Sequence, residues 1–196
     1  MLPLLIVFSY LMGSIPSGYI LVKKKLNKDV REYGSGNIGA TNVRRVAGEK
    51  LSKITAICDM IKAIIPVLLT RILIWSDILK TDASLSLSLV AIAAILGHNY
   101  TIFLKFKGGK GVATSAAAFM IVLPIPFLIT AVIFFGLKLV TKIVSIRSLA
   151  AGVTLFLSTL LLGYNKYYVY ATLFTCLLVF WRHKSNIARL IKGEEK

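Results

Sequence analysis

The chain has 196 residues, of which 57% are hydrophobic and 16% are charged, and its mean hydropathy is +0.78. Soluble domains carry about 25% charged residues, and several charge-poor stretches here reach the roughly 20 residues with which a helix crosses a hydrocarbon core. The net charge of +16 does not indicate nucleic-acid binding, because Lys and Arg border the apolar stretches instead of covering one face of a soluble fold. We therefore expect an all-α integral membrane protein in which residues 1–196 form a single multi-span domain, with no nucleic-acid partner.

The cysteine pattern indicates neither a metal centre nor a disulfide framework. Cys58 and Cys176 lie far apart within apolar stretches, without CxxC spacing and without a cluster of histidines. We expect both thiols to act as small buried apolar groups, and we expect no metal site.

The first apolar stretch, Met1–Val22, is uncharged and is followed by four lysines within residues 23–28. A cleavable signal peptide has the opposite order of charges, so this stretch is expected to span the membrane with its N-terminus outside and with residues 23–50 as a cytoplasmic loop. Leu51–Trp75 and Ser84–Leu104 are the next expected spans, and residues 105–110 form the loop that follows on the cytoplasmic side.

The stretch Gly111–Leu137 has two interpretations. It is either one tilted helix or two short spans that turn at Pro124–Pro126, since paired prolines punctuate helices. With one helix, the basic residues of 138–147 and of the tail 182–196 fall outside the cell, whereas the turn places both inside. We favour the turn, which gives about seven spans and a cytoplasmic C-terminus; six spans is the alternative. The last two expected spans are Ser145–Gly163 and Tyr167–Trp181.

The segment Gly34–Asn42, here called the serine loop, combines glycines with hydroxyl and amide side chains. Its GxGxxG spacing does not predict a dinucleotide site, because a lysine-rich segment precedes it where a β-strand would be required. The tight backbone, followed by Arg44 and Arg45, suits a phosphate group. The alternative is a glycine-rich connector whose arginines reach the lipid interface.

The segment Phe106–Gly111, here called the glycine loop, has the sequence FKGGKG. Its glycines let backbone N–H groups approach an anion closely, and two lysines add positive charge. The segment is not a nucleotide-binding Walker A loop, because Leu104 stands where its first glycine is needed. His98 precedes the loop near the membrane face, and the alternative for this histidine is a hydrogen-bonded packing residue.

A third polar group follows the last expected span and is called the histidine motif (His183–Leu190). His183, Asn186 and Arg189 are three residues apart and therefore share one face of a helix. The alternative is that these residues only anchor lipid headgroups. Within the second span, Asp59 and Lys62 have i, i+3 spacing, and we expect a structural ion pair.

These three motifs, in this order and spread over nearly the whole chain, resemble those of the bacterial acyl-phosphate-dependent glycerol-3-phosphate acyltransferases. The resemblance covers the serine loop, Gly97-His98 with the glycine loop and its continuation to Thr114, and the histidine motif. It implies transfer of a fatty acyl group from acyl phosphate to glycerol 3-phosphate, giving lysophosphatidic acid in the first acylation step of phospholipid synthesis. It further implies a multi-pass protein of the bacterial inner membrane that contacts membrane lipid, uses no cofactor, and works with a soluble enzyme that makes acyl phosphate.

The resemblance also implies roles for individual residues. The expected catalytic residues are Ser35, Arg45, Lys110, His183 and Asn186. The expected substrate-binding residues are Gly36, Asn37, Thr41, Asn42, His98, Lys107, Gly108, Gly109 and Gly111. Two departures from the family pattern stand out: Ala63 follows Lys62 where the family often has glycine, and the adjacent Arg44 and Arg45 leave their separate roles open.

The residue inventory suits acyl transfer between phosphate-bearing substrates, because a cradle with Lys and Arg binds them and stabilises charge on the leaving group. Phe103 stands where the acyltransferases with a His-x4-Asp motif have aspartate after His98, which argues against a His–Asp dyad of that class. The base is either His183 or a phosphate oxygen of the acyl donor. Two other functions are considered: an organophosphate transporter, which would place charges near mid-membrane in repeated halves, and a scaffold that binds lipid headgroups.

Overall fold

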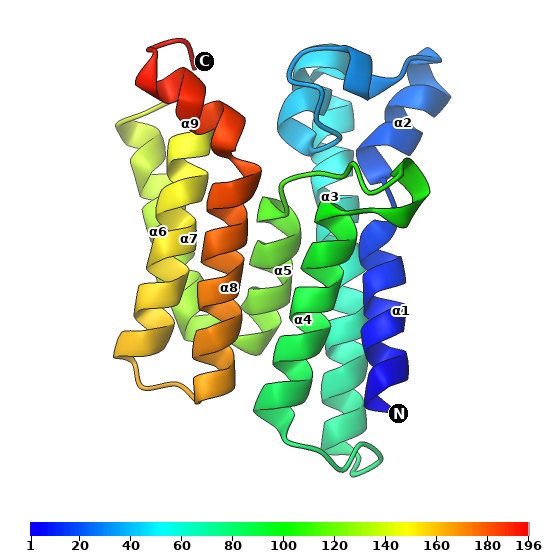
Figure 1. The fold of residues 1–196 in the computed structure, drawn as a ribbon, viewed down its shortest axis with the longest axis vertical. Coiled ribbons are helices and arrows are strands. Elements are labelled where there is room, and N and C mark those ends of the chain that lie inside the picture. The colour runs from blue at the N-terminus through cyan, green and yellow to red at the C-terminus, as the bar shows by residue number, and fades with distance from the viewer. Residues whose placement is uncertain (196) are drawn as a thin grey trace.

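The computed structural model describes residues 1–195, and every regular element in that range is helical, as expected. The α-helices are α1 (Leu2–Ser14), α2 (Ser17–Leu26), α3 (Ala40–Trp75), α4 (Ala83–Asn99), α5 (Val112–Val122), α6 (Pro124–Gly136), α7 (Val144–Leu161), α8 (Lys166–Arg182) and α9 (Lys184–Ile191). Short 3-10 helices, η1 (Val30–Glu32), η2 (Ile102–Leu104) and η3 (Leu137–Leu139), lie in the connections. Figure 1 shows the long helices side by side, with α2 and α9 at the end of the bundle opposite the N-terminus.

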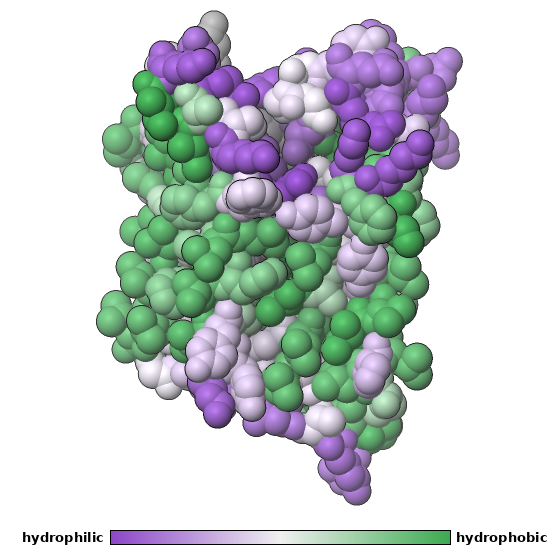
Figure 2. Space-filling view, in the orientation of Figure 1, coloured by the Kyte–Doolittle hydropathy of each residue, from purple (hydrophilic) through white to green (hydrophobic). Residues whose placement is uncertain are grey.

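The outer surface has the polarity expected of a protein in a bilayer. Figure 2 shows an apolar band across the middle of one face of the molecule and polar residues at both ends. By length and composition, three helical stretches of residues 1–195 suffice to cross a membrane: Leu2–Leu26, Ala83–Leu104 and Val144–Leu161. Side chains such as Val132 and Leu177 are more than half exposed along the band, where lipid takes the place of a protein core. The number of spans and the side on which each terminus lies stay predictions.

The first apolar stretch is not one helix, as we had expected, but breaks at Ile15–Pro16 between α1 and α2. Proline has no N–H to continue the helical ladder. Two carbonyls at the break find partners elsewhere in the bundle: the hydroxyl of Thr101, which follows α4, donates to the Ser14 oxygen, and Lys62 Nζ of α3 donates to the Ile15 oxygen at 2.9 Å. The break is tolerated because these groups satisfy the backbone where water is scarce.

The stretch 111–137 turns at its prolines, so the interpretation as a single tilted helix is wrong. α5 ends at Val122 and α6 begins at Pro124, where a missing N–H costs nothing in a first helical turn. At this turn Arg71 Nη1 donates to the Ile121 oxygen at 2.7 Å, next to the C-terminal end of α3. Figure 1 shows the chain reversing between α5 and α6 and returning toward the end of the bundle that carries α9.

The segments expected as loops are partly helical. Within residues 23–50, α2 continues to Leu26 and α3 begins at Ala40; α7 takes the end of 138–147, and α9 occupies much of the tail. α3 has a kink at Gly48, whose φ of 83° leaves the helical region and favours glycine. The turns of α3 before Gly48, which include the end of the serine loop, therefore run in a different direction from the rest of the helix. The composition of the segment did not indicate this kink.

Small residues bring the first helices into close contact. A Cβ on Gly13 would lie 2.1 Å from the Ala94 oxygen, and one on Gly97 would lie 2.1 Å from the Tyr10 oxygen. Helix α1 therefore packs along α4 at backbone distance, as small residues allow in membrane bundles. This packing fixes the end of α4, from which His98 and the glycine loop extend.

Candidate active site

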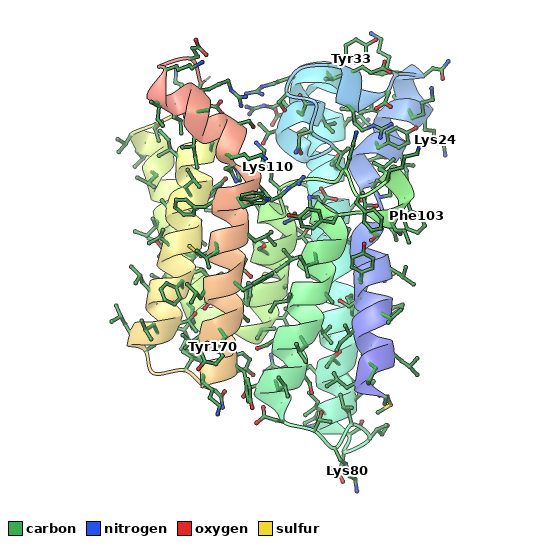
Figure 3. The ribbon with its side chains drawn as sticks, in the orientation of Figure 1. Lys24, Tyr33, Lys80, Phe103, Lys110 and Tyr170 are labelled. Atoms are coloured by element: carbon green, nitrogen blue, oxygen red, sulfur yellow. The ribbon has the colours of Figure 1, made fainter. Side chains whose placement is uncertain are left out.

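All three sequence motifs meet in one cavity of about 560 Å³ at the end of the bundle that carries α2 and α9. Figure 3 places Lys110 at this end, on the same side as Lys24 and Tyr33 and opposite Lys80. The expected site residues that line the cavity are Ser35, Asn37, Thr41, Asn42, Arg45, His98, Lys110, Gly111, His183 and Asn186. The three segments are therefore parts of one site, although they are far apart in the sequence.

Four of the expected site residues lie elsewhere. Gly36, Lys107 and Gly108 line a second, more open cavity of about 550 Å³ on the other side of the glycine loop. Gly109 borders neither cavity; its carbonyl oxygen accepts a hydrogen bond from Arg182 Nε at 3.0 Å. The glycine loop thus separates the two cavities, and its residues face different sides.

Asn42 organises the serine loop. Its Nδ2 donates to the carbonyl oxygens of Val30, Tyr33 and Asn37, and its Oδ1 accepts from the Ser35 N–H at 2.8 Å. The side chain is almost completely buried, and these bonds use its donors and its acceptor within the protein. Asn42 therefore shapes the loop that carries Ser35.

The glycine loop is held from two directions. On the α4 side, the N–H of Gly109 donates to the His98 oxygen at 2.9 Å, and the N–H of Gly108 donates to the Asn99 oxygen at 3.2 Å. On the α8 side, Arg182 donates to the oxygens of Gly109 and Gly108 at 3.0 and 2.9 Å. A Cβ on Gly108 would lie 2.1 Å from the His98 oxygen, so only glycine allows this close approach.

Lys110 is the cation that the glycine loop places in the main cavity. Its Nζ donates a hydrogen bond to Asn186 Oδ1 of α9. Burial lowers the pKa of Lys110 to about 8, against the opposing effect of the Glu195 carboxylate. The ammonium is therefore mostly charged at neutral pH and loses its charge just above it.

Glu195 completes this side of the site, and the sequence did not indicate it. Its Oε1 accepts hydrogen bonds from the Ser145 hydroxyl and Asn186 Nδ2, and its Oε2 accepts from Arg189 Nε at 2.6 Å. Burial acts to raise the pKa of Glu195, but the hydrogen bonds from Asn186, Arg189 and Ser145 outweigh it and lower that pKa. The ionised carboxylate thus fixes the orientation of the Asn186 amide.

His183 lies at the junction of α8 and α9, where burial and then the Lys110 charge lower its pKa to about 4. The imidazole is neutral at pH 7. Its Nδ1 lies 2.8 Å from the Val179 oxygen, so the proton resides on Nδ1 and Nε2 is left as an acceptor. A backbone carbonyl thus orients this ring.

Three helices begin at the cavity. The lining includes the starts of α3 (Gly39, Ala40, Thr41), α5 (Gly111, Val112, Ala113) and α7 (Val144, Ser145). Helix N-termini carry unpaired N–H groups and a partial positive charge, which together bind anions. Beyond them the lining becomes apolar, with Phe119, Phe127, Ala131, Phe134 and Leu155 from α5, α6 and α7. The cavity therefore offers an anion-binding end and an apolar remainder.

The buried ion pair expected within the second span is confirmed, with Lys62 Nζ 2.9 Å from Asp59 Oδ1. Asp59 Oδ1 also lies 3.6 Å from His98 Nδ1, just beyond hydrogen-bonding range. We had argued against a His–Asp arrangement because Phe103 follows His98 at the relevant spacing. The carboxylate instead comes from α3, a contact that local spacing cannot reveal.

Arg182 and Ser145 also belong to the site and were not expected there. Arg182 belongs to the polar group that follows the last expected span, and Ser145 begins an expected span, but neither was given a role in the site. The only sign in the sequence that they could belong to the site was their position at the end of α8 and the start of α7, on the same side of the bundle as the three motifs.

The comparisons with known proteins find relatives that match nearly the whole chain. The family model for glycerol-3-phosphate acyltransferase matches residues 3–193. Glycerol-3-phosphate acyltransferase of Clostridium acetobutylicum is 47% identical over 191 residues, covering 97% of this chain and 96% of that protein. A protein of the same name from Thermus thermophilus is 40% identical, and the match covers 97% of this chain and 92% of that protein.

Solved structures extend the similarity to the fold. The chain superposes on the crystal structure of PlsY (YgiH), described as an integral membrane glycerol 3-phosphate acyltransferase, in its glycerol 3-phosphate form with a TM-score of 0.90 and 35% identity. The comparison with the lysophosphatidic acid form of PlsY gives a TM-score of 0.86 and 34% sequence identity. Both matches cover 100% of this chain and 94% of the other. With sequence motifs, helical membrane architecture and one shared cavity in agreement, the chain belongs to the glycerol-3-phosphate acyltransferase family.

Proposed function

We propose that this protein transfers a fatty acyl group from acyl phosphate to glycerol 3-phosphate, giving lysophosphatidic acid and inorganic phosphate. The observation that carries the proposal is the two-part cavity: Lys110, Arg45 and the starts of three helices line one end, and apolar side chains line the remainder. The first part suits phosphate groups, and the second suits an acyl chain. Because these groups gather at one end of the bundle, an interfacial reaction fits better than transport of an organophosphate.

The reaction needs no covalent enzyme intermediate. The hydroxyl oxygen of glycerol 3-phosphate attacks the carbonyl carbon of acyl phosphate, and the bond from that carbon to the bridging oxygen breaks. Phosphate leaves with the bridging oxygen, and the hydroxyl proton moves to a phosphate oxygen. Lys110 and Arg45 stabilise the negative charge that grows on the leaving phosphate and on the carbonyl oxygen.

We assign His183 to orientation of the hydroxyl and not to proton removal. Nε2 is available to accept a hydrogen bond from that hydroxyl, but a base with a pKa of about 4 is weak at neutral pH. This leaves a phosphate oxygen of the acyl donor as the proton acceptor. Asn186 holds Lys110 in place, and the Ser35 hydroxyl donates to one of the bound phosphates.

The remaining expected residues take supporting roles in this proposal. Asn37, Thr41 and Gly111 meet substrate in the main cavity, and Asn42 and Gly109 shape the two loops. The others, apart from His98, border the more open cavity: Gly36, Lys107 and Gly108. Lys107 meets the phosphate there as it approaches, whereas the N–H and the oxygen of Gly108 are already bonded to Asn99 and Arg182.

The cellular setting follows the same proposal. We infer seven spans with the N-terminus outside and the C-terminus in the cytoplasm, because the turn between α5 and α6 brings the basic ends to one side. The protein then lies in the bacterial inner membrane, and a soluble cytoplasmic enzyme supplies the acyl phosphate.

One assay tests the reaction. Purified protein in detergent micelles is given palmitoyl phosphate and labelled glycerol 3-phosphate, and the labelled lysophosphatidic acid is measured. We expect product with palmitoyl phosphate and none with palmitoyl-coenzyme A as the control donor. Product from the coenzyme A ester alone would overturn the proposed donor, and no product from either would overturn the reaction.

A further inference from the structure

A line of buried polar side chains connects the break between α1 and α2 to the glycine loop, and the proposed chemistry does not use it. Lys62 Nζ donates to the Ile15 oxygen at 2.9 Å and lies 2.9 Å from Asp59 Oδ1. The same oxygen of Asp59 lies 3.6 Å from His98 Nδ1. Lys62, Asp59 and His98 are only 3%, 3% and 4% exposed, so these polar groups depend on one another and not on water for their partners.

His98 lies directly against the glycine loop. The Gly109 N–H donates to the His98 oxygen, and a Cβ on Gly109 would lie only 2.0 Å from His98 Nε2. No space separates the imidazole ring from the loop backbone, and packed interiors transmit such displacements. Since Lys110 is the next residue, a shift or rotation of the ring moves the cation that reaches Asn186.

The two members of the ion pair have different neighbours. Lys62 satisfies the carbonyl at the helix break, which is sufficient structural reason for its presence. Asp59 faces the imidazole instead, and both Asp59 and His98 border the main cavity. Buried ion pairs are expensive in a membrane and can often be replaced by apolar residues, so a purely structural pair would not require the histidine as a third member.

We propose that Asp59 and His98 are positioning residues for acyl transfer. The Asp59 carboxylate favours the tautomer with its proton on Nδ1 and holds the ring in one orientation, as carboxylates do for histidines that act elsewhere. The oriented ring fixes the position of the Gly109 backbone relative to the cavity. It thereby places Lys110, the next residue, against a substrate phosphate. This inference rests on the proposed function, because it assigns the loop to phosphate binding.

The first test removes both charges together, since Asp59→Asn alone would leave a buried ammonium without its carboxylate. The double variant D59N/K62M should fold but raise the KM for a phosphate-bearing substrate about 10- to 100-fold, the loss that follows when a group is misplaced by about 1 Å. KM is measured separately for glycerol 3-phosphate and for acyl phosphate, which identifies the phosphate that the loop holds. Unchanged kinetic constants in a folded, less stable double variant would mean that the pair is structural only and would overturn the proposal.

The matched control lies on the same helix. Arg71→Gln also removes a charged donor that bonds a backbone oxygen on another helix, but at the far end of α3. It should lower the thermal unfolding temperature and leave both KM values within about twofold, since it contacts α5 at the end opposite the glycine loop. If Arg71→Gln raised KM as much as D59N/K62M does, a general loss of stability would explain both increases, contrary to the proposal.

The second test keeps the ion pair and therefore does not depend on whether the double variant folds. His98→Gln should raise the same KM by a similar factor. In the H98Q background, D59N/K62M should add little, because groups that act through one another are not additive; full additivity, or a normal KM in H98Q, would overturn the proposal. Wild-type turnover with acyl phosphate tests the proposed function, whereas the ratios of variants to wild type test only the positioning role.

Discussion

Lys110 Nζ donates a hydrogen bond to Asn186 Oδ1, joining two residues that are 76 positions apart in the chain. The bond connects the glycine loop to α9 inside the cavity. On its other side the Asn186 amide donates to Glu195. The principal cation of the site is therefore held by an amide whose own orientation is set by the Glu195 side-chain carboxylate.

Removal of either phosphate-binding cation should abolish most of the activity. One such donor in a preorganised site contributes about 3 kcal/mol, or roughly a hundredfold in rate. Lys110→Ala and Arg45→Ala should each lower kcat/KM by about that factor while the protein still inserts and elutes as wild type. Lys24→Ala and Lys192→Ala remove exposed lysines that do not line the main cavity, and they should have little effect. Full activity in K110A would contradict a phosphate cradle at the glycine loop.

The pH dependence of kcat/KM should report on Lys110 in the free enzyme. Its pKa of about 8 means that the ammonium is present below that pH and is lost as the pH rises through it. Phosphate monoesters are already dianionic there, since their second pKa is about 6. We therefore expect kcat/KM to fall above about pH 8, measured as initial rates on both sides of that value. Lys110→Arg, whose guanidinium stays charged, should move this fall to higher pH; an unchanged profile in K110R would assign the fall to another group.

Loss of His183 should affect binding more than turnover. If Nε2 orients the substrate hydroxyl, His183→Ala raises the KM for glycerol 3-phosphate, and saturating substrate restores much of the rate. The pKa of about 4 further predicts no ionisation of this residue near neutral pH in the wild-type profile. A hundredfold loss of kcat at unchanged KM, together with a wild-type group titrating near the ordinary histidine pKa of about 6.5, would identify His183 as a general base instead.

Glu195→Gln should weaken both the site and the fold near the C-terminus. The lowered pKa of Glu195 means that its stabilising effect is present above the pKa of an unfolded glutamate and is lost as pH falls through the lower folded value. The glutamine amide cannot accept all the hydrogen bonds from Asn186, Arg189 and Ser145, so we expect kcat/KM to drop about tenfold or more, with a lower unfolding temperature at pH 7. Glu194→Gln, at the exposed neighbouring position, is the matched control. Equal behaviour of the two variants would remove Glu195 from the site.

Cysteine accessibility in sealed cells tests the topology. In a background with Cys58 and Cys176 replaced by alanine, single cysteines are placed at Lys110 and at Asn165, and an impermeant thiol reagent is added from outside. The seven-span arrangement predicts labelling at position 165 and protection at 110 until the cells are opened. Labelling of position 110 from outside would contradict both the orientation and a cytoplasmic site.

The sequence by itself determined the class of the protein and the three segments that meet at its candidate site. Composition and the length of the apolar stretches indicate a helical membrane protein, because the bilayer imposes helices on every spanning segment. The serine loop, the glycine loop and the histidine motif were each visible, since their chemistry lies in consecutive residues. The proline turn in 111–137 was also predictable, as the basic segments on either side of it share one side of the membrane only if the chain reverses.

The tertiary structure alone decided which of these residues meet. Pro16 breaks the first helix because Lys62 and Thr101, from other parts of the bundle, satisfy the carbonyls that the break leaves free. Asp59 of α3 lies close to His98 of the neighbouring helix α4. Glu195 contacts Asn186 because the chain turns back after α9. Such contacts depend on how helices pack, and packing is set by the summed fit of many small and apolar side chains. No spacing along the chain encodes that sum, and so the pattern of residues identified the parts of the site while the bundle determined their arrangement.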